Sequence, residues 1–271
     1  MKILILGSNG MLGQMVYKYF SSKYDVEVYN KRFTIENRRV FLEEIKGFGD
    51  CIIINCIGRI KQKSSNIFDL YFVNSILPFD LANGINEGQT LIQPSTDCVY
   101  SGTNNSFYNS SNIPDAIDDY GWSKALGEKA ILNKDNCYLI RVSIIGSDNT
   151  ASPKGLLGWF LSNNDNEIIQ GYTDHWWNGI TTLEWCKKVE LLVFKDENRE
   201  NSGRILQLGT IEKHSKFELI NYFQTTYNTK FIIQPYSSGM YTNRCLTPNY
   251  PSGHIIDQLK ELKKIDNVSK P

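Results

Sequence analysis

The chain has 271 residues, enough for one large domain or two modest ones with a sizeable apolar core. Its 29 basic side chains balance its 29 acidic ones, which argues against a nucleic-acid-binding protein because such proteins need a basic surface. No run of about 18 apolar residues predicts a membrane span, and the first residues do not resemble a secretory leader. We therefore expect a cytoplasmic protein that binds neither nucleic acid nor membrane.

The cysteines and histidines form no recognisable cluster. The six cysteines are scattered without a Cys-x-x-Cys pair, and several lie in apolar runs, where a free thiol behaves as a small hydrophobe. His175, His214 and His254 are far apart in the sequence. We therefore expect free cysteines and no metal site.

A glycine-rich turn follows the first predicted strand, residues 2–6, and precedes apolar residues at helical spacing. In a dinucleotide-binding turn the first glycine permits the tight bend, the second lets the backbone approach a pyrophosphate, and the third lets the helix pack closely. The helix N-terminus then offers free N–H groups to the phosphates. An ordinary structural turn is the alternative. We predict cofactor contacts over the whole motif, which is Gly7, Ser8, Asn9, Gly10, Met11, Leu12 and Gly13.

The second predicted strand, residues 25–29, is followed by Asn30, Lys31 and Arg32. Many NAD-binding proteins carry an acidic residue here that holds the ribose 2′-hydroxyl. This chain has two cations instead, which suit a 2′-phosphate. The sequence therefore favours NADPH over NADH, with a solvated basic turn as the alternative.

The middle of the chain alternates apolar strands with helices. This order indicates an α/β fold with a doubly wound, Rossmann-like parallel sheet. We expect a dinucleotide-binding part over residues 1–150 and a smaller substrate-binding part over residues 151–271, interleaved with the first. The predicted strands are residues 51–56, 89–93 and 137–142, and the predicted helices are residues 66–83 and the segment that carries Tyr120. Residues 103–112, rich in Asn and Ser, are a predicted exposed loop.

Ligands in such sheets bind at the carboxyl ends of the strands. Cys56, Ile57 and Gly58 come at the end of one predicted strand, where a small residue lets the chain approach a cofactor, and Lys61 lies just beyond them. The next strand is followed by Ser95, Thr96 and Asp97, and the last by Ser143. We expect these side chains to meet along one edge of the sheet.

Tyr120 and Lys124 lie four residues apart and therefore one helical turn from each other. An ammonium beside a phenol favours the phenolate, so it lowers the phenol's pKa. A free tyrosine holds its proton too tightly for good acid–base work at neutral pH. The pair is thus a chemically sensible general acid, although such pairs also occur on ordinary solvated helix faces.

With these motifs the chain resembles the extended short-chain dehydrogenases/reductases, and within them the dTDP-4-dehydrorhamnose reductases and related sugar-nucleotide reductases. The resemblance is strongest over residues 1–146. One departure is Cys98-Val99-Tyr100-Ser101-Gly102, where the family often has Tyr-Val-Phe-Asp-Gly. The segments that carry the resemblance are the glycine-rich motif at residues 7–13, Ser95-Thr96-Asp97 with Gly102, and Tyr120-Gly121-Trp122-Ser123-Lys124.

The resemblance implies roles for individual residues. Tyr120 would give a proton to the substrate carbonyl oxygen, and Thr96 would hold the same oxygen. Lys124 would lower the pKa of Tyr120 and bind the nicotinamide ribose. Asn74 and Ser143 match positions that line the cofactor cleft in this family, with an ordinary polar role as the equal alternative. This agrees with the chemistry, because hydride addition to a ketone leaves an alkoxide that needs a donor and a positioned hydroxyl.

The last third should build the substrate side. Aromatic rings stack on other rings and cations pair with a diphosphate, so Trp177 and Arg244 join Lys61 and Asp97 as predicted substrate contacts. The resemblance adds Asn178, in a segment that weakly matches the family. Asp97 is as well suited to holding its own turn. Further candidates are Lys154, His175 and Trp176, for which a core tryptophan pair beside a surface histidine is the alternative. Predicted elements here are a helix at residues 180–194, a strand at 204–208 and a helix at 216–223.

The sequence therefore predicts an NADPH-dependent reductase of a nucleoside-diphosphate 4-keto-6-deoxy sugar, in nucleotide-sugar biosynthesis for surface polysaccharide. NADH remains possible. An epimerase or dehydratase of the same superfamily is one alternative, and a non-catalytic regulatory homologue is another. The sugar, the base and the oligomeric state stay open, with a homodimer as one option.

Overall fold

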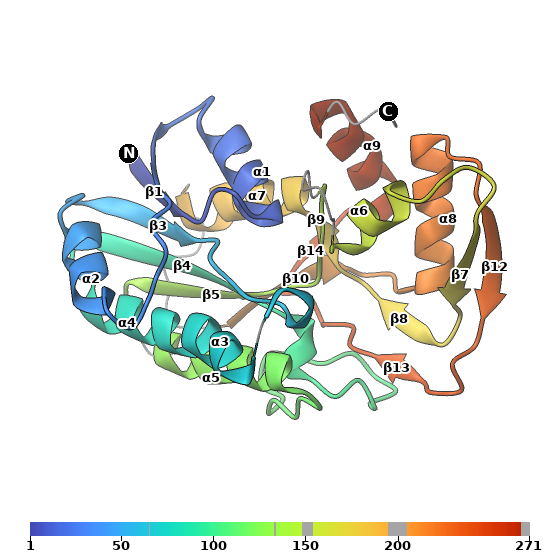
Figure 1. Ribbon diagram of the computed structural model, residues 1–271, viewed down its shortest axis with the longest axis horizontal. Coiled ribbons are helices and arrows are strands. Elements are labelled where there is room, and N and C mark those ends of the chain that lie inside the picture. Colours follow the sequence, from blue (N-terminus) through green and yellow to red (C-terminus); the bar gives the residue numbers. More distant parts are fainter. Residues whose placement is uncertain (65, 133, 148–153, 195–204, 267–271) are drawn as a thin grey trace.

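A computed structural model describes residues 1–64, 66–132, 134–147, 154–194 and 205–266. Its centre is a seven-stranded sheet in which every neighbouring pair is parallel, in the order β14-β10-β5-β4-β3-β1-β2 (Figure 1). The order changes direction between β3 and β1, and this is the position where such sheets open a crevice for a ligand. The strands are β1 (Lys2–Leu6), β2 (Asp25–Tyr29), β3 (Cys51–Asn55), β4 (Gln89–Ser95), β5 (Cys137–Arg141), β10 (Ile205–Thr210) and β14 (Tyr250–Ser252).

Helices cover both faces of this sheet (Figure 1). One face carries α1 (Met11–Phe20) and α7 (Thr182–Val189), and the other carries α2 (Arg38–Lys46), α4 (Leu77–Gly84) and α5 (Asp119–Ile131). Alternate residues of β1 enter the two apolar cores: Ile3 and Ile5 join one, and Leu4 and Leu6 the other. Burial on both faces explains why these strands are continuous apolar runs.

A smaller layer lies at one end of the sheet, on the right in Figure 1. Its α8 begins with a capping box, in which Ser215 and Glu218 satisfy each other's backbone N–H groups. Its elements are α6 (Leu156–Leu161), β7 (Ile168–Tyr172), β8 (His175–Trp177), β11 (His214–Ser215), α8 (Lys216–Tyr227), β12 (Ile232–Tyr236) and β13 (Thr242–Asn243). The short pair β6 (Ile144–Ile145) and β9 (Ile180–Thr181) and the helix α9 (Ile255–Asp266) complete the main elements.

The structure confirms the α/β class and changes several predicted bounds. The helix predicted at residues 66–83 is divided into α3 (Ile67–Tyr71), the π-helical segment η2 (Phe72–Ile76) and α4. The helix predicted at residues 180–194 starts later, because Thr181 caps α7, and it ends in the π-helical segment η4 (Glu190–Phe194). The predicted exposed loop at 103–112 contains a buried residue, Tyr108, whose ring stacks on Tyr100. β10 and β14 belong to the central sheet, and the boundary near residue 150 stays a prediction.

Two negative findings concern the described residues only. None of their helices is long and apolar enough to cross a membrane. Nor does any group of three or more His, Cys, Asp or Glu side chains among them lie in a position to hold a metal ion.

Candidate active site

The glycine-rich turn has the geometry that a close phosphate contact requires. Gly7 has φ +77°, and a Cβ there would lie 2.7 Å from the Ile57 side chain, so only glycine fits without strain. A Cβ on Gly13 would lie 2.2 Å from the Gly7 carbonyl oxygen, which shows how closely α1 packs on the turn. A Cβ on Gly10 would make only ordinary contacts, the nearest at 3.8 Å from the Gly7 carbonyl oxygen, and Gly10 itself lines a cavity. The N-terminus of α1 therefore stands free for a ligand.

The predicted 2′-phosphate residues lie beside this turn, but they differ in their contacts. The Asn30 side chain accepts hydrogen bonds from the Ser8 backbone N–H (3.1 Å) and hydroxyl (3.2 Å), so it braces the turn. Lys31 donates to Glu44 at 2.5 Å, and its charge is already paired. The guanidinium of exposed Arg32 has no hydrogen bond or ion pair with the residues that the structure describes. Of the two cations, Arg32 is therefore the one whose charge is not already paired with a described residue.

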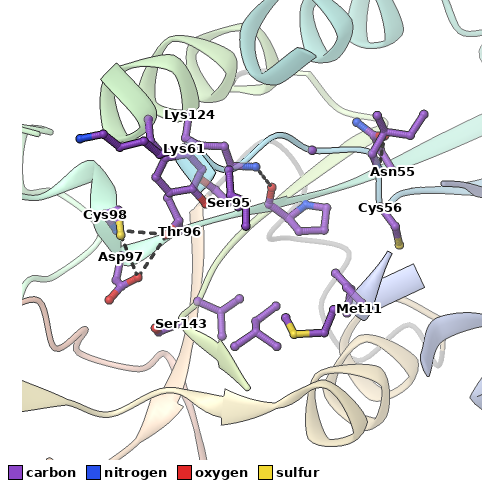
Figure 2. A pocket seen from close by; sticks show the side chains of 18 of the residues that line it. Met11, Asn55, Cys56, Lys61, Ser95, Thr96, Asp97, Cys98, Lys124 and Ser143 are labelled. Carbon is purple, nitrogen blue, oxygen red and sulfur yellow. Dashed lines mark hydrogen bonds between the residues drawn. The ribbon is translucent and has the colours of Figure 1, made fainter. Parts of the chain in front are cut away.

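Two cavities run along the carboxyl ends of the strands. The larger, of about 440 Å³, contains the predicted catalytic residues, and the smaller, of about 260 Å³, is lined by Gly7, Gly10 and residues 30–32. Cys56, Ile57 and Gly58 line both, so the two cavities lie next to each other at the carboxyl end of β3, and together they are called the groove. Figure 2 shows Thr96 and Lys124 on one wall of the larger cavity and Met11 and Ser143 on the opposite one.

Helix α5 carries Tyr120 and Lys124 into this cavity. Asp118 caps the helix by accepting from the Gly121 N–H at 2.9 Å. A Cβ on Gly121 would lie 2.2 Å from the Cys98 carbonyl oxygen, so the first turn of α5 packs tightly against the segment that follows Thr96. This close approach brings Tyr120 and Thr96, which are far apart in the sequence, to the same cavity.

Burial dominates the electrostatics of the pair. Burial, the Cys98 thiol and nearby carboxylates raise the pKa of Tyr120, and a hydrogen bond from Thr96 partly opposes them. Lys124 donates to the Pro94 carbonyl oxygen at 2.9 Å, and burial lowers its own pKa to about 8. The net shift of the Tyr120 pKa is therefore upward, and a lowering effect of Lys124 on it stays a prediction. Tyr120 keeps its proton at neutral pH, as a proton donor must.

Thr96 is held by its neighbours. Its hydroxyl donates to Asp97 at 3.1 Å and accepts from the Cys98 N–H at 3.2 Å, which caps the short helix η3 (Asp97–Val99). A hydroxyl can rotate between acceptors, so Thr96 can also reach a substrate oxygen in the cavity. The Asp97 carboxylate both holds this turn and lines the cavity.

Of the remaining predicted cofactor residues, Ser143 lines the larger cavity and Asn74 is buried away from it. Ser143 lines the larger cavity and accepts from the Trp177 indole N–H at 2.9 Å. Asn74 is buried, and its side chain bonds the Arg59 backbone N–H and carbonyl at 2.9 Å each and the Ser123 hydroxyl at 3.0 Å. Asn74 therefore fixes the loop after β3 to α5 rather than facing the groove.

The predicted substrate residues are only partly brought together. Lys61 lines the larger cavity, whereas Trp177, Asn178 and Arg244 are not among its lining residues. Trp177 is buried beneath Ser143, and Arg244 donates to the Tyr100 carbonyl oxygen at 2.9 Å. Asn178 is a correction: its amide group bonds backbone atoms of Thr210 and Leu246 at 2.8–2.9 Å, which leaves no free donor for a substrate.

The other substrate candidates from the last third, His175, Trp176 and Lys154, lie outside the larger cavity's lining. His175 stacks on Tyr172 and bonds the Ser238 hydroxyl at 3.0 Å. The ammonium of Lys213 lies 4.4 Å from the centre of the Trp176 ring. Lys154 is exposed. None of these three candidates is among the residues that line the larger cavity.

Some site residues were missed in the sequence. Cys98 and Asp118 line the larger cavity, and Phe33 and Phe72, which stack at 4.8 Å, line the smaller one. Glu128 lies one turn beyond Lys124 on α5 and contacts Ser95 directly. Its spacing from Tyr120 and Lys124 is the one sequence signal that could have identified it.

Comparison with known proteins now decides the family. The family model described as "RmlD substrate binding domain" matches residues 1–165, more than half of the chain. The chain belongs to the RmlD family. The matched region contains the glycine-rich turn, residues 56–58, which line both cavities, and Thr96, Tyr120 and Lys124.

Individual relatives of this RmlD-family chain are distant. It is 26% identical over 181 residues to the "Probable low-salt glycan biosynthesis reductase Agl14" of Haloferax volcanii, and the match spans 60% of each chain. A dTDP-4-dehydrorhamnose reductase of Bacillus anthracis, solved with NADP, superposes with a TM-score of 0.79 at 19% identity and covers 96% of this chain and 98% of that one. A dTDP-glucose 4,6-dehydratase from the same organism, solved with NAD, gives 0.76 at 16% identity, with 98% and 96% covered. These two likenesses show the fold.

Proposed function

We propose that this protein is an NADPH-dependent reductase of a nucleoside-diphosphate 4-keto-6-deoxy sugar. One observation carries the proposal. Thr96, Tyr120 and Lys124 line the larger cavity, and the smaller cavity beside it is lined by the glycine-rich turn. The names of the similar proteins support it, because a glycan biosynthesis reductase and a dTDP-4-dehydrorhamnose reductase are among them.

The groove fits a dinucleotide. Gly10, which lines the smaller cavity without a side chain, suits a pyrophosphate, and exposed Arg32 suits a 2′-phosphate. The stacked pair Phe33 and Phe72 lines the same end and offers an apolar surface to a base. When bound, NADPH would supply the hydride.

The chain's own residues supply orientation and the proton. Tyr120, protonated at neutral pH, can give its proton to an oxygen that gains negative charge in the cavity. The Thr96 hydroxyl can donate a second hydrogen bond to the same oxygen. The Lys124 ammonium adds positive charge at this end of the groove, where burial strengthens its effect.

The site argues against a dehydratase. A dehydratase generally needs an acid and a base beside the threonine, and here Asp97 is followed by Cys98. Burial, together with Asp97, raises the pKa of Cys98 to about 12, so this thiol stays protonated and cannot act as a base at neutral pH. The fold itself does not separate the two activities, because a reductase and a dehydratase superpose almost equally well.

The test is a substrate panel. Purified protein with NADPH would be mixed with dTDP-, UDP-, GDP- and CDP-linked 4-keto-6-deoxy sugars, and NADPH consumption would be followed by its absorbance. Turnover of at least one sugar is expected, and the Tyr120→Phe protein serves as the matched control. A folded protein that binds NADPH but consumes none with any sugar would favour a regulatory role. Tightly retained nicotinamide after purification would favour an epimerase or dehydratase. A homodimer and a cytoplasmic location stay predictions from the sequence.

A further inference from the structure

A buried ionic cluster lies directly behind the catalytic residues. The Arg141 guanidinium donates to both carboxylate oxygens of Glu128, from Nε at 2.9 Å and from Nη2 at 2.6 Å. Both side chains are only 2% exposed. Arg141 also donates to the Tyr100 hydroxyl at 2.6 Å, and the Ser95 hydroxyl donates to Glu128 at 2.5 Å. Burying two charges has a desolvation cost that good geometry only offsets, so ordinary core packing does not account for this cluster.

Glu128, Ser95 and Arg141 each lie within four residues in sequence of a residue that lines the larger cavity. Glu128 lies one helical turn after Lys124 on α5, and Ser95 immediately precedes Thr96 at the end of β4. Arg141 ends β5, two residues before Ser143. The Lys124 ammonium bonds the carbonyl of Pro94, the residue before Ser95. The cluster therefore joins the helix and the two strands that carry the cavity's polar side chains.

The Glu128 carboxylate favours the charged form of Lys124. Burial disfavours its ammonium, and the Glu128 carboxylate opposes that effect and raises its pKa. Without that carboxylate, the buried ammonium would lose its proton at a lower pH. The ionisable groups that share its cavity or pack on this part of α5 include Cys56, Lys61, Asp97, Cys98, Asp118, Tyr120 and Arg141.

We propose that Glu128 is a positioning residue that keeps the Lys124 ammonium charged and directed into the cavity, with Arg141 and Ser95 fixing the carboxylate. Glu128 is not among the residues that line the larger cavity, and it acts through Lys124. A catalytic role for Glu128 rests on the proposed function. The effect of Glu128 on the pKa of Lys124 does not, because that pKa can be measured without a substrate.

The experiment measures the pKa of Lys124 directly. The rate at which the Lys124 amine is acetylated by acetic anhydride would be followed against pH by mass spectrometry of its peptide, in the full chain. Glu128→Gln keeps the shape of the side chain and removes its charge, and the pKa of Lys124 should fall by about one unit or more. The same shift should appear in the pH dependence of NADPH binding if the ammonium contacts the cofactor.

Two further variants separate charge from stability. Glu128→Gln leaves Arg141 buried without its partner and can unfold the chain. The double variant Glu128→Gln/Arg141→Met removes both charges together, and the pKa of Lys124 should still fall. Asp80→Asn is the matched control, because it breaks another ion pair, with Arg38 at 2.8 Å, away from the cavity. It should leave the pKa of Lys124 unchanged.

An unchanged or raised pKa of Lys124 in the double variant would overturn the inference, even if the protein were less stable. Failure of the substrate panel would leave this result standing, and a working reductase with an unshifted Lys124 would reject the inference alone.

Discussion

The two ends of the groove use lysine in different ways. At the end that holds Tyr120, half-buried Lys124 lines the larger cavity, bonds a backbone carbonyl and has its pKa lowered to about 8 by burial. At the other end Lys31 is exposed and bonds the Glu44 carboxylate. A buried charge is strong and sensitive to its neighbours, whereas an exposed one is weakened by water and salt. Substitutions at the catalytic end should therefore have the larger effects.

The largest effect is expected at Tyr120. Tyr120→Phe removes the proton and keeps the ring and its packing, so the rate should fall by roughly 10²–10⁴ while the fold and NADPH affinity change little. Thr96→Val removes one hydrogen bond to the developing alkoxide and should cost less. Steady-state kinetics on the accepted sugar would give the order. A Tyr120→Phe protein with the wild-type rate would remove the basis of the proposed mechanism.

Lys124→Met should come next, with a fall in rate of about 10² from the loss of a buried positive charge near the reacting oxygen. Unlike Tyr120→Phe, it should also weaken NADPH binding, because the ammonium is expected to touch the ribose. Fluorescence titration with NADPH measures this second effect. Equal NADPH affinities of the two variants would show that Lys124 makes no cofactor contact.

Arg32→Ala tests the exposed end. It should raise the Kd for NADPH by about tenfold, roughly 1.4 kcal/mol, and leave NADH binding unchanged, because only NADPH carries the 2′-phosphate. Lys31→Ala is the matched control and should have a smaller effect, since Glu44 already pairs with Lys31. The assignment would be reversed if the Lys31 variant lost more NADPH affinity than the Arg32 variant.

The smallest effect concerns stability against pH. The pKa of Lys124 is about 8 in the fold and 10.5 as its ordinary value, so between these values the unfolded chain binds more protons. The free energy of unfolding should therefore gain from this residue as the pH rises through that window. Denaturant unfolding at neutral pH and near pH 10 should show a smaller gain in Lys124→Met than in the wild type. Identical pH dependences would show that Lys124 titrates normally.

The main features of the first half follow from local patterns. The apolar run of β1 and the glycine spacing predict a strand, a turn and a helix, and the structure has β1, the turn at Gly7 and α1 in that order. The sequence pattern failed at the π-helical segment η2, because apolar periodicity does not show an extra residue in a helical turn. It also failed at Tyr108, since a polar loop can be held down by one buried ring.

The sequence by itself determined which residues of the first half lie at the carboxyl ends of the strands, because strand, turn and helix signals are local and place side chains at known ends of a parallel sheet. Only the tertiary structure decided the protonation states of these residues and which of the predicted substrate residues line the cavity. Burial, which raises the pKa of Tyr120 and lowers that of Lys124, depends on every element packed around them. The amide of Asn178 was taken up by two backbone segments that lie far from it in the sequence, and no local pattern could have shown this.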